Sequence, residues 1–470
     1  MSVSLKEIIK GFPSEDESDY RSKNRALFSE LDKILVVVDD DPTGNQTVYD
    51  IPLLSAWSTD VFVKEFIEGT PVFYVLTNSR SLTPEATSKV YKEVAQNLLK
   101  ASELTQKKFT VLSRGDSTLR GHFPLEPETL QQHLKLNNAI TVFIPVMFEG
   151  NRVTVNSTHY IKDEDTLTPV NETPFAQDHS FTYSKGNLKE YIEEKSNGHV
   201  KSDEVFSFAI EEIRRWDVKI LAEHILEIPE ASYCVFDSLN YNDLDKVTHA
   251  LLLAEKYGKQ IIYRTSSSFV PSYIGLKPKG LLLPKDVIDD NTKHGGLTVV
   301  GSYVKKSSEQ LANALSLFDA SQIVEVDVSQ VLSETSNQYI ADLVSSIDTT
   351  ILKGEDVIVY TSRKLVTGTD GNETVNIASK ISNALVAIVK GIRERPKYLM
   401  AKGGITSHDL ATKGLGMERA KVLGQIQPGI PLWEMGSETK FSKLPYIVFP
   451  GNVGDENTLQ TIITKLNHHD

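Results

Sequence analysis

The sequence predicts an α/β protein of two domains, each with a mostly parallel sheet flanked by helices. Short apolar runs alternate with helix-like segments along most of the 470-residue chain, which is the pattern of parallel strands joined by helical crossovers. Polar clusters directly follow several of these runs, at the place where doubly wound sheets bind their ligands. Because one core seldom keeps growing beyond about 300 residues, a chain of this length is expected to form two domains.

The first domain is expected to span residues 1–290. Its opening strand, 33–38, runs into Asp39, Asp40 and Asp41, as a buried parallel strand does when it delivers side chains to a sheet edge. The further predicted strands are 71–76, 109–112, 140–145, 233–237 and 260–264, with helices over 88–103 and 243–257. Residues 151–198 are polar, so we interpret them as a long excursion from this sheet.

The second domain is expected to span residues 291–470, after a polar, glycine-containing joint at 289–296. Its predicted strands are 297–300, 322–326, 356–360, 398–401 and 446–449, and an amphipathic helix is predicted over 308–318. Three of these strands end in small or flexible polar residues. The domain therefore offers several glycine-bearing loops at one sheet edge.

In the first domain, the polar clusters combine carboxylates with guanidinium groups. Arg binds a carboxylate through two parallel hydrogen bonds, and Asp accepts hydrogen bonds from sugar hydroxyls. Such a mixture suits a hydroxylated acid, although an Arg–Asp ion pair that stiffens a loop is the structural alternative. The predicted substrate-binding residues are Asp40, Asp41, Arg80, Asp116 and Arg120, with Asn151 and Arg152 as weaker candidates.

In the second domain, glycines lie just after apolar strands, where backbone N–H groups can approach a phosphate closely. The segment Lys402, Gly403, Gly404 and Thr406 follows a strand and leads into a predicted helix from about Ser407. A second cradle contains Gly451, Asn452 and Gly454. Neither the P-loop nor the dinucleotide glycine fingerprint is present. The residues thus indicate phosphate binding but name no nucleotide.

Three residues near these loops each allow two interpretations, one functional and one structural. Tyr303 and Trp433 could flank a purine ring, although a core role is more common for either aromatic. Asp455 could orient or deprotonate an attacking hydroxyl, or it could cap a helix that begins near Glu456.

Composition excludes several classes of protein. The net charge of −13, without a basic stripe, argues against a nucleic-acid partner. No apolar segment reaches the roughly 20 residues of a membrane span, so a cytoplasmic protein is the default expectation. Cys234 is the only cysteine, which rules out an intrachain disulfide and a cysteine-rich metal site. His122 and His159 have no histidine partner at metal-ligand spacing, so we expect structural roles and no protein metal site.

Six ordered motifs resemble the four-carbon acid sugar kinase family over nearly the whole chain. They are DDDPTG (39–44), DSTLRG (116–121), GSY (301–303), AKGGITS (401–407), ATKGLG (411–416) and FPGNVGD (449–455). The resemblance implies an N-terminal acid-binding domain, a C-terminal ATP-binding domain and phosphorylation of a four-carbon acid such as threonate, erythronate or 3-oxo-tetronate.

The resemblance also implies roles for individual residues. Asp40, Asp116 and Arg120 would hold the acid. The ATP contacts implied by position are Ser302, Thr361, Ser362, Arg363, Lys364, Gly403, Gly404 and the loop 451–455. We expect Mg²⁺ to bridge the ATP phosphates, domain closure to bring acid and nucleotide together, and Asp455 to act as the base, with Asp116 as the next candidate.

The departures from the family pattern cluster on the acid-binding side. Members often carry two lysines where Ser113 and Arg114 stand, an isoleucine at Gly115, and a leucine in place of Asp41 and Pro42. These changes leave the identity of the acid open, and a homodimer stays open as well. A non-catalytic sensor with nucleotide as an allosteric ligand is the alternative function, and a dinucleotide-dependent dehydrogenase lacks its glycine fingerprint.

Overall fold

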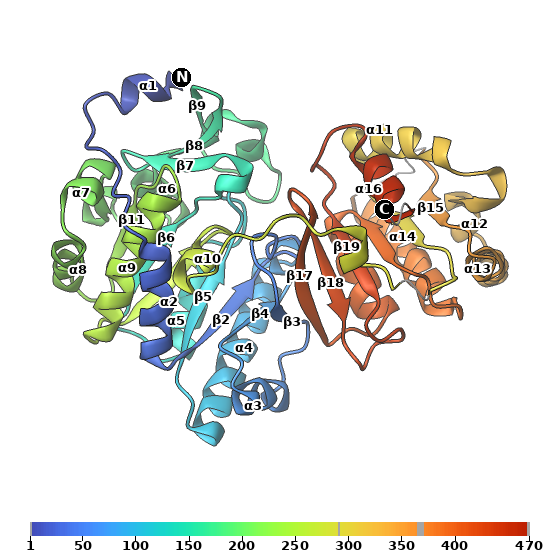
Figure 1. Ribbon diagram of the computed structural model, residues 1–470, viewed down its shortest axis with the longest axis horizontal. Coiled ribbons are helices and arrows are strands. Elements are labelled where there is room, and N and C mark those ends of the chain that lie inside the picture. The colour runs from blue at the N-terminus through green and yellow to red at the C-terminus, as the bar shows by residue number, and fades with distance from the viewer. Residues whose placement is uncertain (1, 290–291, 364–370, 468–470) are drawn as a thin grey trace. The chain divides into compact units, whose positions relative to one another are not determined.

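The computed structural model describes residues 2–289, 292–363 and 371–467, which form two compact units (Figure 1). Unit 1 comprises Met1–Val48 and Ala56–Pro278, and unit 2 comprises Tyr49–Ser55 and Lys279–Asp470. Each unit contains a large sheet with helices packed against it. The predicted α/β class, with two mostly parallel sheets, is confirmed.

The main sheet of unit 1 is parallel throughout, in the order β10-β11-β6-β12-β5-β2-β4. Its strands are β2 (Ile34–Asp39), β4 (Val72–Leu76), β5 (Phe109–Arg114), β6 (Ile140–Ile144), β10 (Phe206–Phe208), β11 (Tyr233–Phe236) and β12 (Ile261–Thr265). Every residue of β2, β4 and β6 is buried, as expected for strands covered on both faces. All predicted strands of this domain are present.

The helices of unit 1 fall into two packed groups. One contains α2 (Tyr20–Leu31), α7 (Ile210–Arg215), α8 (Val218–Glu227), α9 (Tyr241–Lys256) and α10 (Phe269–Tyr273), and the other contains α3 (Thr59–Glu68), α4 (Pro84–Thr105) and α5 (Leu125–His133). Sequence signals set the ends: Thr83 accepts the backbone N–H of Ala86 and Pro84 occupies the first turn of α4.

The predicted excursion supplies three strands of a small antiparallel sheet in the order β1-β9-β8-β7, and the N-terminal strand β1 completes it. Its strands are β1 (Val3–Ser4), β7 (Arg152–Val155), β8 (Thr158–Asp163) and β9 (Thr166–Pro169), and helices α1 (Leu5–Ile8) and α6 (Leu188–Lys195) flank it in sequence. A bridge between Thr154 and Ser238 ties this sheet to the segment that follows β11. The excursion therefore stands at the carboxyl-end edge of the main sheet.

The sheet of unit 2 has the order β3-β17-β18-β19-β16-β13-β15-β14. Strands β13 (Leu297–Val300), β14 (Ile323–Val326), β15 (Val357–Thr361), β16 (Leu399–Lys402) and β19 (Pro445–Phe449) are parallel, whereas β3 (Ile51–Leu54), β17 (Arg419–Gln427) and β18 (Ile430–Met435) pair antiparallel. The sequence predicted the parallel strands and missed the antiparallel ones. Residues of β17 alternate between buried and partly exposed positions. The corresponding alternation of apolar and polar residues in the sequence is the signal that could have identified this strand.

The helices of unit 2 are α11 (Lys305–Ala314), α12 (Val328–Val331), α13 (Ser336–Leu352), α14 (Gly371–Gly391), α15 (Gly404–Asp409) and α16 (Thr458–Asn467). Helix α15 begins three residues earlier than predicted and continues as a π-helical turn, Leu410–Gly414. Helices α11 and α16 pack together over the core of this unit.

The division between the units differs from the predicted boundary at residue 290. It lies between Pro278 and Lys279 because Leu282, Val287 and Ile288 are buried in the hydrophobic core of unit 2. The segment Tyr49–Ser55 also belongs to unit 2, since β3 pairs antiparallel with β17. This long-range pairing left no local signal in the sequence.

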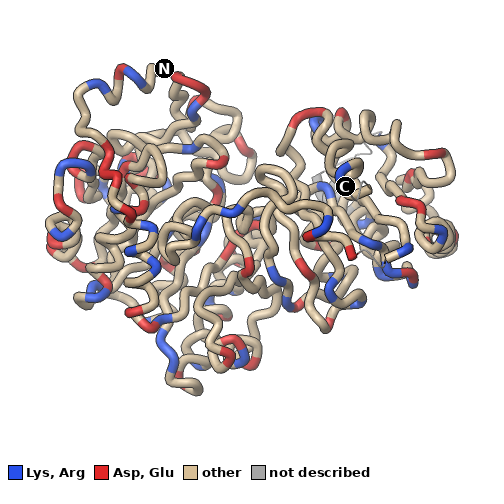
Figure 2. Tube along the Cα trace, viewed as in Figure 1, with Lys and Arg blue, Asp and Glu red and all other residues tan. Residues whose placement is uncertain are grey.

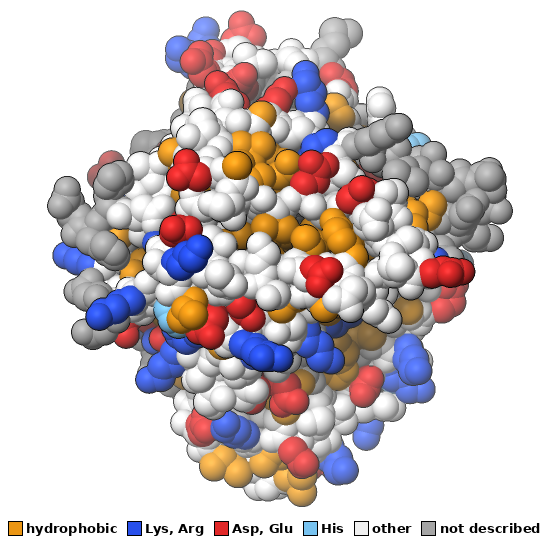
Figure 3. Space-filling view, turned by 90° about the vertical axis from the view of Figure 1, so that its right-hand side faces the viewer, with side chains coloured by type: hydrophobic (Ala, Val, Ile, Leu, Met, Phe, Trp, Pro, Cys, Tyr) orange, Lys and Arg blue, Asp and Glu red, His pale blue; other side chains and the backbone are white. Residues whose placement is uncertain are grey.

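Positions of basic and acidic residues are interspersed along the chain (Figure 2). On the face shown in Figure 3, hydrophobic side chains gather between scattered acidic and basic ones, and no basic stripe is visible on that face. Among the described helices, none combines the length and apolar character that crossing a membrane requires.

The boundary can be tested at two neighbouring leucines. Leu282 is 3% exposed and Leu281 is 43% exposed. We expect Leu282→Ala to lower the free energy of unfolding by about 2–5 kcal/mol, because it leaves a cavity in the core of unit 2. Leu281→Ala should change it by less than about 0.5 kcal/mol. Urea denaturation measures both, and equal losses would place Leu282 outside that core.

Candidate functional site

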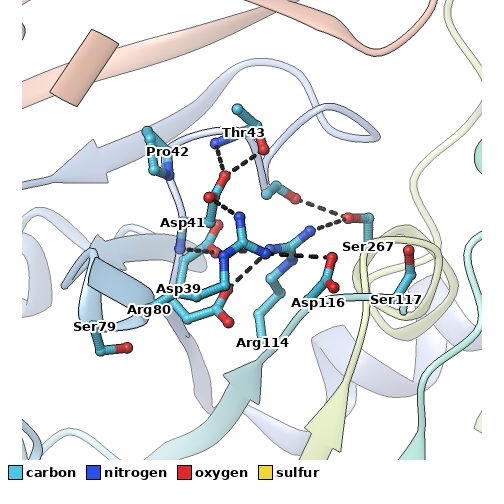
Figure 4. A network of polar contacts seen from close by, with 12 residues as sticks. Asp39, Asp41, Pro42, Thr43, Ser79, Arg80, Arg114, Asp116, Ser117 and Ser267 are labelled. Atoms are coloured by element: carbon cyan, nitrogen blue, oxygen red, sulfur yellow. Dashed lines mark hydrogen bonds and ion pairs between the residues drawn. The ribbon is translucent and has the colours of Figure 1, made fainter. Parts of the chain in front are cut away.

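The polar residues of unit 1 meet where β2, β4, β5 and β12 end (Figure 4). Because these strands are parallel, their carboxyl ends share one sheet edge. Asp39 is the last residue of β2 and Asp40 and Asp41 follow it; Arg80 follows β4. Arg114 is the last residue of β5, and Asp116 comes two residues later. Residues far apart in sequence thereby form one cluster of carboxylates and guanidinium groups.

Arg114 lies at the centre of this cluster. Its Nη1 contacts Asp39 Oδ1 at 3.3 Å and Asp40 Oδ1 at 3.1 Å, and its Nη2 donates to Ser267 Oγ at 2.9 Å. Arg114 Nε, Asp39 Oδ2 and Asp40 Oδ2 are buried without a hydrogen-bond partner among the described residues. Buried polar atoms usually have partners, so this edge retains hydrogen-bonding capacity.

A second chain of ion pairs runs along the same edge. Arg80 pairs with Asp41, and its Nη1 lies 3.3 Å from Asp116 Oδ1. Asp116 Oδ2 accepts from Arg120 Nε at 2.9 Å. Burial alone would raise the pKa of Asp116, but Arg80 and Arg120 lower that pKa below its ordinary range. Asp116 is therefore a poor proton acceptor.

The pKa of Asp39 is shifted in the direction opposite to that of Asp116. It is fully buried, and this burial raises its pKa to about 7, with Arg114 partly opposing the shift and Asp40 adding to it. Gly44 approaches this carboxylate so closely that a Cβ there would lie 2.2 Å from Asp39 Oδ2. Glycine at 44 is thus required by the close approach of the loop to Asp39.

Arg264, from β12, fills the space above Gly115. Its Nη1 donates to Ser113 Oγ at 2.9 Å and pairs with Glu126 Oε2 at 2.5 Å. A Cβ at Gly115 would lie 2.3 Å from the guanidinium carbon of Arg264, and one at Gly121 would lie 3.1 Å from its Nη2. The glycines on both sides of the Asp116 loop therefore make room for a buried arginine.

The excursion is bonded to the Asp116 loop at three places. His159 Nε2 lies 2.8 Å from Ser117 O, Tyr183 donates to Thr118 O at 2.7 Å, and Tyr191 donates to Leu119 O at 2.7 Å. His159 is fully buried, and burial lowers its pKa to about 4. It is thus a neutral structural residue, as predicted, and the excursion supports the site directly.

The structure brings together all five predicted acid-binding residues, Asp40, Asp41, Arg80, Asp116 and Arg120. The sequence missed other members of the cluster: Glu126, Phe175, Asp178, Arg264 and Ser267. The serines that directly follow β12 gave a usable signal, since they form another polar cluster after a strand. Phe175 and Asp178 lie in the excursion, where no periodic pattern identifies them.

In unit 2, the loops after β13, β16 and β19 also converge. A Cβ at Gly301 would lie 2.2 Å from Thr406 Oγ1, and one at Gly451 would lie 3.0 Å from Ser302 Oγ. Gly403 has φ +119, and a Cβ there would lie 3.2 Å from Ser302 Cβ. Side chains are excluded from this spot, so backbone and hydroxyl groups line it.

Side chains of α11 hold these loops together. Ser307 Oγ donates to Ser302 Oγ and to Gly451 O, each at 3.0 Å. Gln310 Nε2 donates to Val453 O at 3.0 Å. The Gly403 N–H, expected to face a phosphate, donates instead to Phe449 O at 2.8 Å. That amide therefore belongs to the loop framework.

Arg363 connects β15 to the same place. Its Nη2 donates to Ser302 O at 2.8 Å and to Ser308 Oγ at 2.6 Å, and its guanidinium lies 5.4 Å from the centroid of the Tyr303 ring. Arg363 Nη1 is buried without a partner among the described residues. Tyr303 is 38% exposed and remains a candidate for a ligand ring, whereas Trp433 is fully buried against Tyr446.

Lys402 supports the loops from beneath. Its Nζ donates to Pro450 O at 3.2 Å and lies 3.6 Å from the centroid of the Phe449 ring. Burial lowers the pKa of this ammonium to about 7, and Lys306 adds to the shift. A neighbouring anion would raise that pKa again, because it stabilises the charged form.

Asp455 makes the contacts of a residue that shapes the start of α16. Its Oδ1 accepts from the N–H of Asn457 at 3.0 Å and from Thr458 Oγ1 at 2.8 Å, and it is exposed. These hydrogen bonds lower the pKa of its carboxyl group, the Thr458 hydroxyl most of all. The capping alternative therefore describes the geometry seen.

The remaining residues predicted to bind the nucleotide lie in different parts of unit 2 and differ in exposure. Thr361 and Ser362 lie at the end of β15 beside Arg363, and the Ser362 hydroxyl accepts from the N–H of Val328 at 3.3 Å. Asn452 is exposed, and a Cβ at Gly454 would lie 2.4 Å from Thr458 Oγ1. Lys364 lies outside the described residues.

The glycine cradle of unit 2 fits a phosphate-bearing group. Ser302, Thr406, Gly451 and Arg363 would hold it, since hydroxyls, close backbone and a guanidinium with an unused donor surround one spot. In the described part of the chain, no group of three or more His, Cys, Asp or Glu side chains is placed to hold a metal ion. Mg²⁺ that enters with a nucleotide is coordinated largely by phosphates and water, so it needs no such cage.

Two family models match the chain. A sugar-binding N-terminal domain matches residues 35–273, and a nucleotide-binding C-terminal domain matches residues 297–459. The D-threonate kinase of Salmonella typhimurium strain LT2 is 23% identical over 447 residues, which are 91% of this chain and 96% of that protein.

Solved structures share the fold. A Haemophilus influenzae protein assigned to a family of unknown function has a TM-score of 0.61 and 16% identity, over 91% of this chain and 99% of its own. A Salmonella typhimurium LT2 protein has a TM-score of 0.66 and 14% identity, over 92% and 98%. The fold is therefore shared with these solved structures.

The packing of Arg264 can be tested at Gly115. We expect Gly115→Ala to destabilise unit 1 by about 1–3 kcal/mol, because the added methyl group displaces a buried, paired guanidinium. Gly280→Ala is the matched control, since a Cβ there meets nothing within 4 Å. Urea denaturation compares the two variants with the unaltered protein. A Gly115→Ala protein as stable as the control would contradict the described position of Arg264.

Lys402 predicts a pH dependence of stability. Burial lowers its pKa to about 7 in the folded protein, from 10.5 for an unperturbed lysine, so the unfolded chain binds more protons between these two pH values. The free energy of unfolding, relative to a Lys402→Met variant, should therefore rise as the pH increases from about 7 to about 10. Urea titrations across this range measure the difference, and a constant difference would mean that Lys402 titrates normally.

Proposed function

The chain belongs to the four-carbon acid sugar kinase family, and from this premise we propose that it transfers the γ-phosphoryl group of ATP to a hydroxyl group of a four-carbon sugar acid. The observation that carries the proposal is the cluster at the strand ends of unit 1. There, guanidinium groups and carboxylates with unused hydrogen-bonding atoms converge within the segment matched as sugar-binding.

The two kinds of side chain suit the two ends of such a substrate. Arginines bind carboxylates through charge-assisted hydrogen bonds, and aspartates accept hydrogen bonds from hydroxyl groups. Asp40 Oδ2 is buried and has no partner among the described residues, so a substrate hydroxyl would satisfy it. Asp41, Arg80, Asp116 and Arg120 would fix the orientation of the acid through their mutual ion pairs.

The nucleotide is assigned to unit 2. The relative with the name D-threonate kinase supports a kinase, and the cradle of Gly301, Ser302, Thr406 and Gly451 supports phosphate binding. Arg363 would donate to a phosphate oxygen through its unused Nη1. Bound ATP with Mg²⁺ would supply the phosphoryl group and neutralise part of the phosphate charge.

The chemistry needs an acceptor for one proton. As the hydroxyl oxygen of the acid bonds to the γ-phosphorus, the bond from phosphorus to the ADP oxygen breaks and the hydroxyl proton leaves. Asp455 is the proposed acceptor, as the family resemblance implies, with Asp116 as the next candidate. The pKa of each carboxyl group is lowered, so either would take the proton only as the new bond to phosphorus forms. Positioning and electrostatic stabilisation would then supply most of the rate enhancement.

The proposal is tested by measuring ADP release from ATP and Mg²⁺ in the presence of each tetronate isomer and 3-oxo-tetronate. Release that depends on one acid, with a phosphorylated acid as product, is the expected result. Binding of an acid and ATP without ADP release would favour the alternative of a sensor. A change in nicotinamide absorbance with the same acids would favour a dehydrogenase. The homodimer and the cytoplasmic location stay predictions.

Two substitutions separate the roles of Asp455. If it accepts the proton, Asp455→Asn should reduce kcat by about a hundredfold or more. If it only shapes the start of α16, Asp455→Asn should retain turnover, because asparagine accepts the same backbone hydrogen bonds. Asp455→Ala removes both roles and reports the cost of the lost contacts in thermal unfolding. Unchanged turnover in Asp455→Asn would remove this residue from the chemistry.

A further inference from the structure

Arg152, the first residue of β7, is the one arginine at the unit 1 site without an acidic partner among the described residues. Arg80 pairs with Asp41 and Asp116, Arg114 with Asp39 and Asp40, Arg120 with Asp116 and Asp178, and Arg264 with Glu126. Among the described residues, the side chain of Arg152 donates a single hydrogen bond, from its Nη1 to Gly150 O. Its charge is therefore not balanced by an ion pair.

The surroundings place Arg152 beside the acid-binding cluster. Its guanidinium carbon lies 5.9 Å from the centroid of the Phe175 ring, and that of Arg120 lies 5.0 Å from the same centroid. Two guanidinium groups thus share one aromatic ring. The ring belongs to the turn Pro174–Gln177, directly before Asp178, which contacts Arg120 at 3.7 Å.

Arg152 is only partly buried, yet its Nε is buried without a partner in the described structure. Burial lowers the pKa of Arg152, Asp116 opposes that shift and Arg120 adds to it. Two neighbouring cations repel each other, and a buried donor of a charged group is destabilising when it has no acceptor. An anion placed near Arg152 and Arg120 would relieve both costs.

We propose that Arg152 binds the carboxylate group of the acid substrate, together with Arg120, next to the ring of Phe175. This inference rests on the proposed function, since it names the part of the site that distinguishes an acid from a neutral sugar. The carboxylates of Asp40 and Asp116 lie in the same cluster and suit the hydroxyl groups of the same molecule. Arg152 is then a specificity-determining residue supplied by the excursion.

The position of Arg152 in the fold supports this role. Strand β7 is held to β8, and His159 of β8 is bonded to Thr154 and to Ser117 O. The excursion therefore fixes Arg152 relative to the loop that carries Asp116 and Arg120. Preorganised groups of this kind bind a ligand without an ordering cost.

The test compares each acid that the unaltered enzyme phosphorylates with the primary amide of the same acid. The amide keeps the hydroxyl groups and removes the negative charge. Arg152→Gln should reduce kcat/KM for the acid about 10- to 100-fold, mainly through KM. Its kcat/KM for the amide and its KM for ATP should stay within about twofold. The preference for acid over amide would then collapse, and Arg152→Lys should restore part of it.

Arg215→Gln is the matched control, because the side chain of this arginine of α7 is 68% exposed and lies 4.0 Å from Glu211. It should retain the preference of the unaltered enzyme. Equal losses for acid and amide in Arg152→Gln, or an unchanged preference, would overturn the inference. If Arg152→Gln unfolds, the inference is tested with Arg152→Lys alone. Lysine keeps the charge but should still weaken acid binding severalfold, and unchanged acid binding would overturn the inference.

Failure of the proposed function gives a different result. If no acid supports ADP release, calorimetric titration of the unaltered protein and of Arg152→Gln with threonate and threonamide still measures the contribution of the charge. Weaker threonate binding in Arg152→Gln, with unchanged threonamide binding, supports the carboxylate contact. Equal threonate binding by both proteins overturns it.

Discussion

The unit 1 site depends on the burial of charged guanidinium groups at the end of a parallel sheet. Arg114 and Arg264 are each 3% exposed. Taking an arginine out of water costs several kcal/mol, and only close carboxylates and further hydrogen bonds offset that cost. Asp39 and Asp40 do this for Arg114, and Glu126 with Ser113 does it for Arg264. The carboxylates are therefore required by the fold as well as suited to a ligand.

This constraint also explains where the chain departs from its family. The family resemblance leads us to expect two lysines and an isoleucine where this chain has Ser113, Arg114 and Gly115. Here Ser113 accepts a hydrogen bond from Arg264, and Gly115 leaves the space that the guanidinium of Arg264 fills. Arg114 reaches Asp39, Asp40 and Ser267. The three departures thus act together, because a cation from β12 occupies room that a side chain at 115 would take.

The constraint in unit 2 is different: several loops approach one another so closely that side chains would obstruct them. Gly301, Gly403 and Gly451 stand where a Cβ would meet Ser302 or Thr406, so glycine is needed for the loops to converge. Lys402 supports them from beneath. The glycine motifs in the sequence predicted loops that follow strands, and the structure shows that these loops converge. The motifs alone did not separate residues that face the cradle from those that build it, such as Gly403 and Lys402.

The sequence by itself determined the α/β class, nearly all parallel strands and the sheet edge at which the five predicted acid-binding residues gather, because buried strands and the polar clusters that follow them are local patterns. Only the tertiary structure decided that β3 pairs with β17, that Tyr49–Ser55 joins the chain from Lys279 onward in unit 2, and that Arg264, Asp178 and Phe175 join the cluster. These contacts join residues far apart in the chain. They arise from the complementarity of packed elements, which no short stretch of sequence encodes.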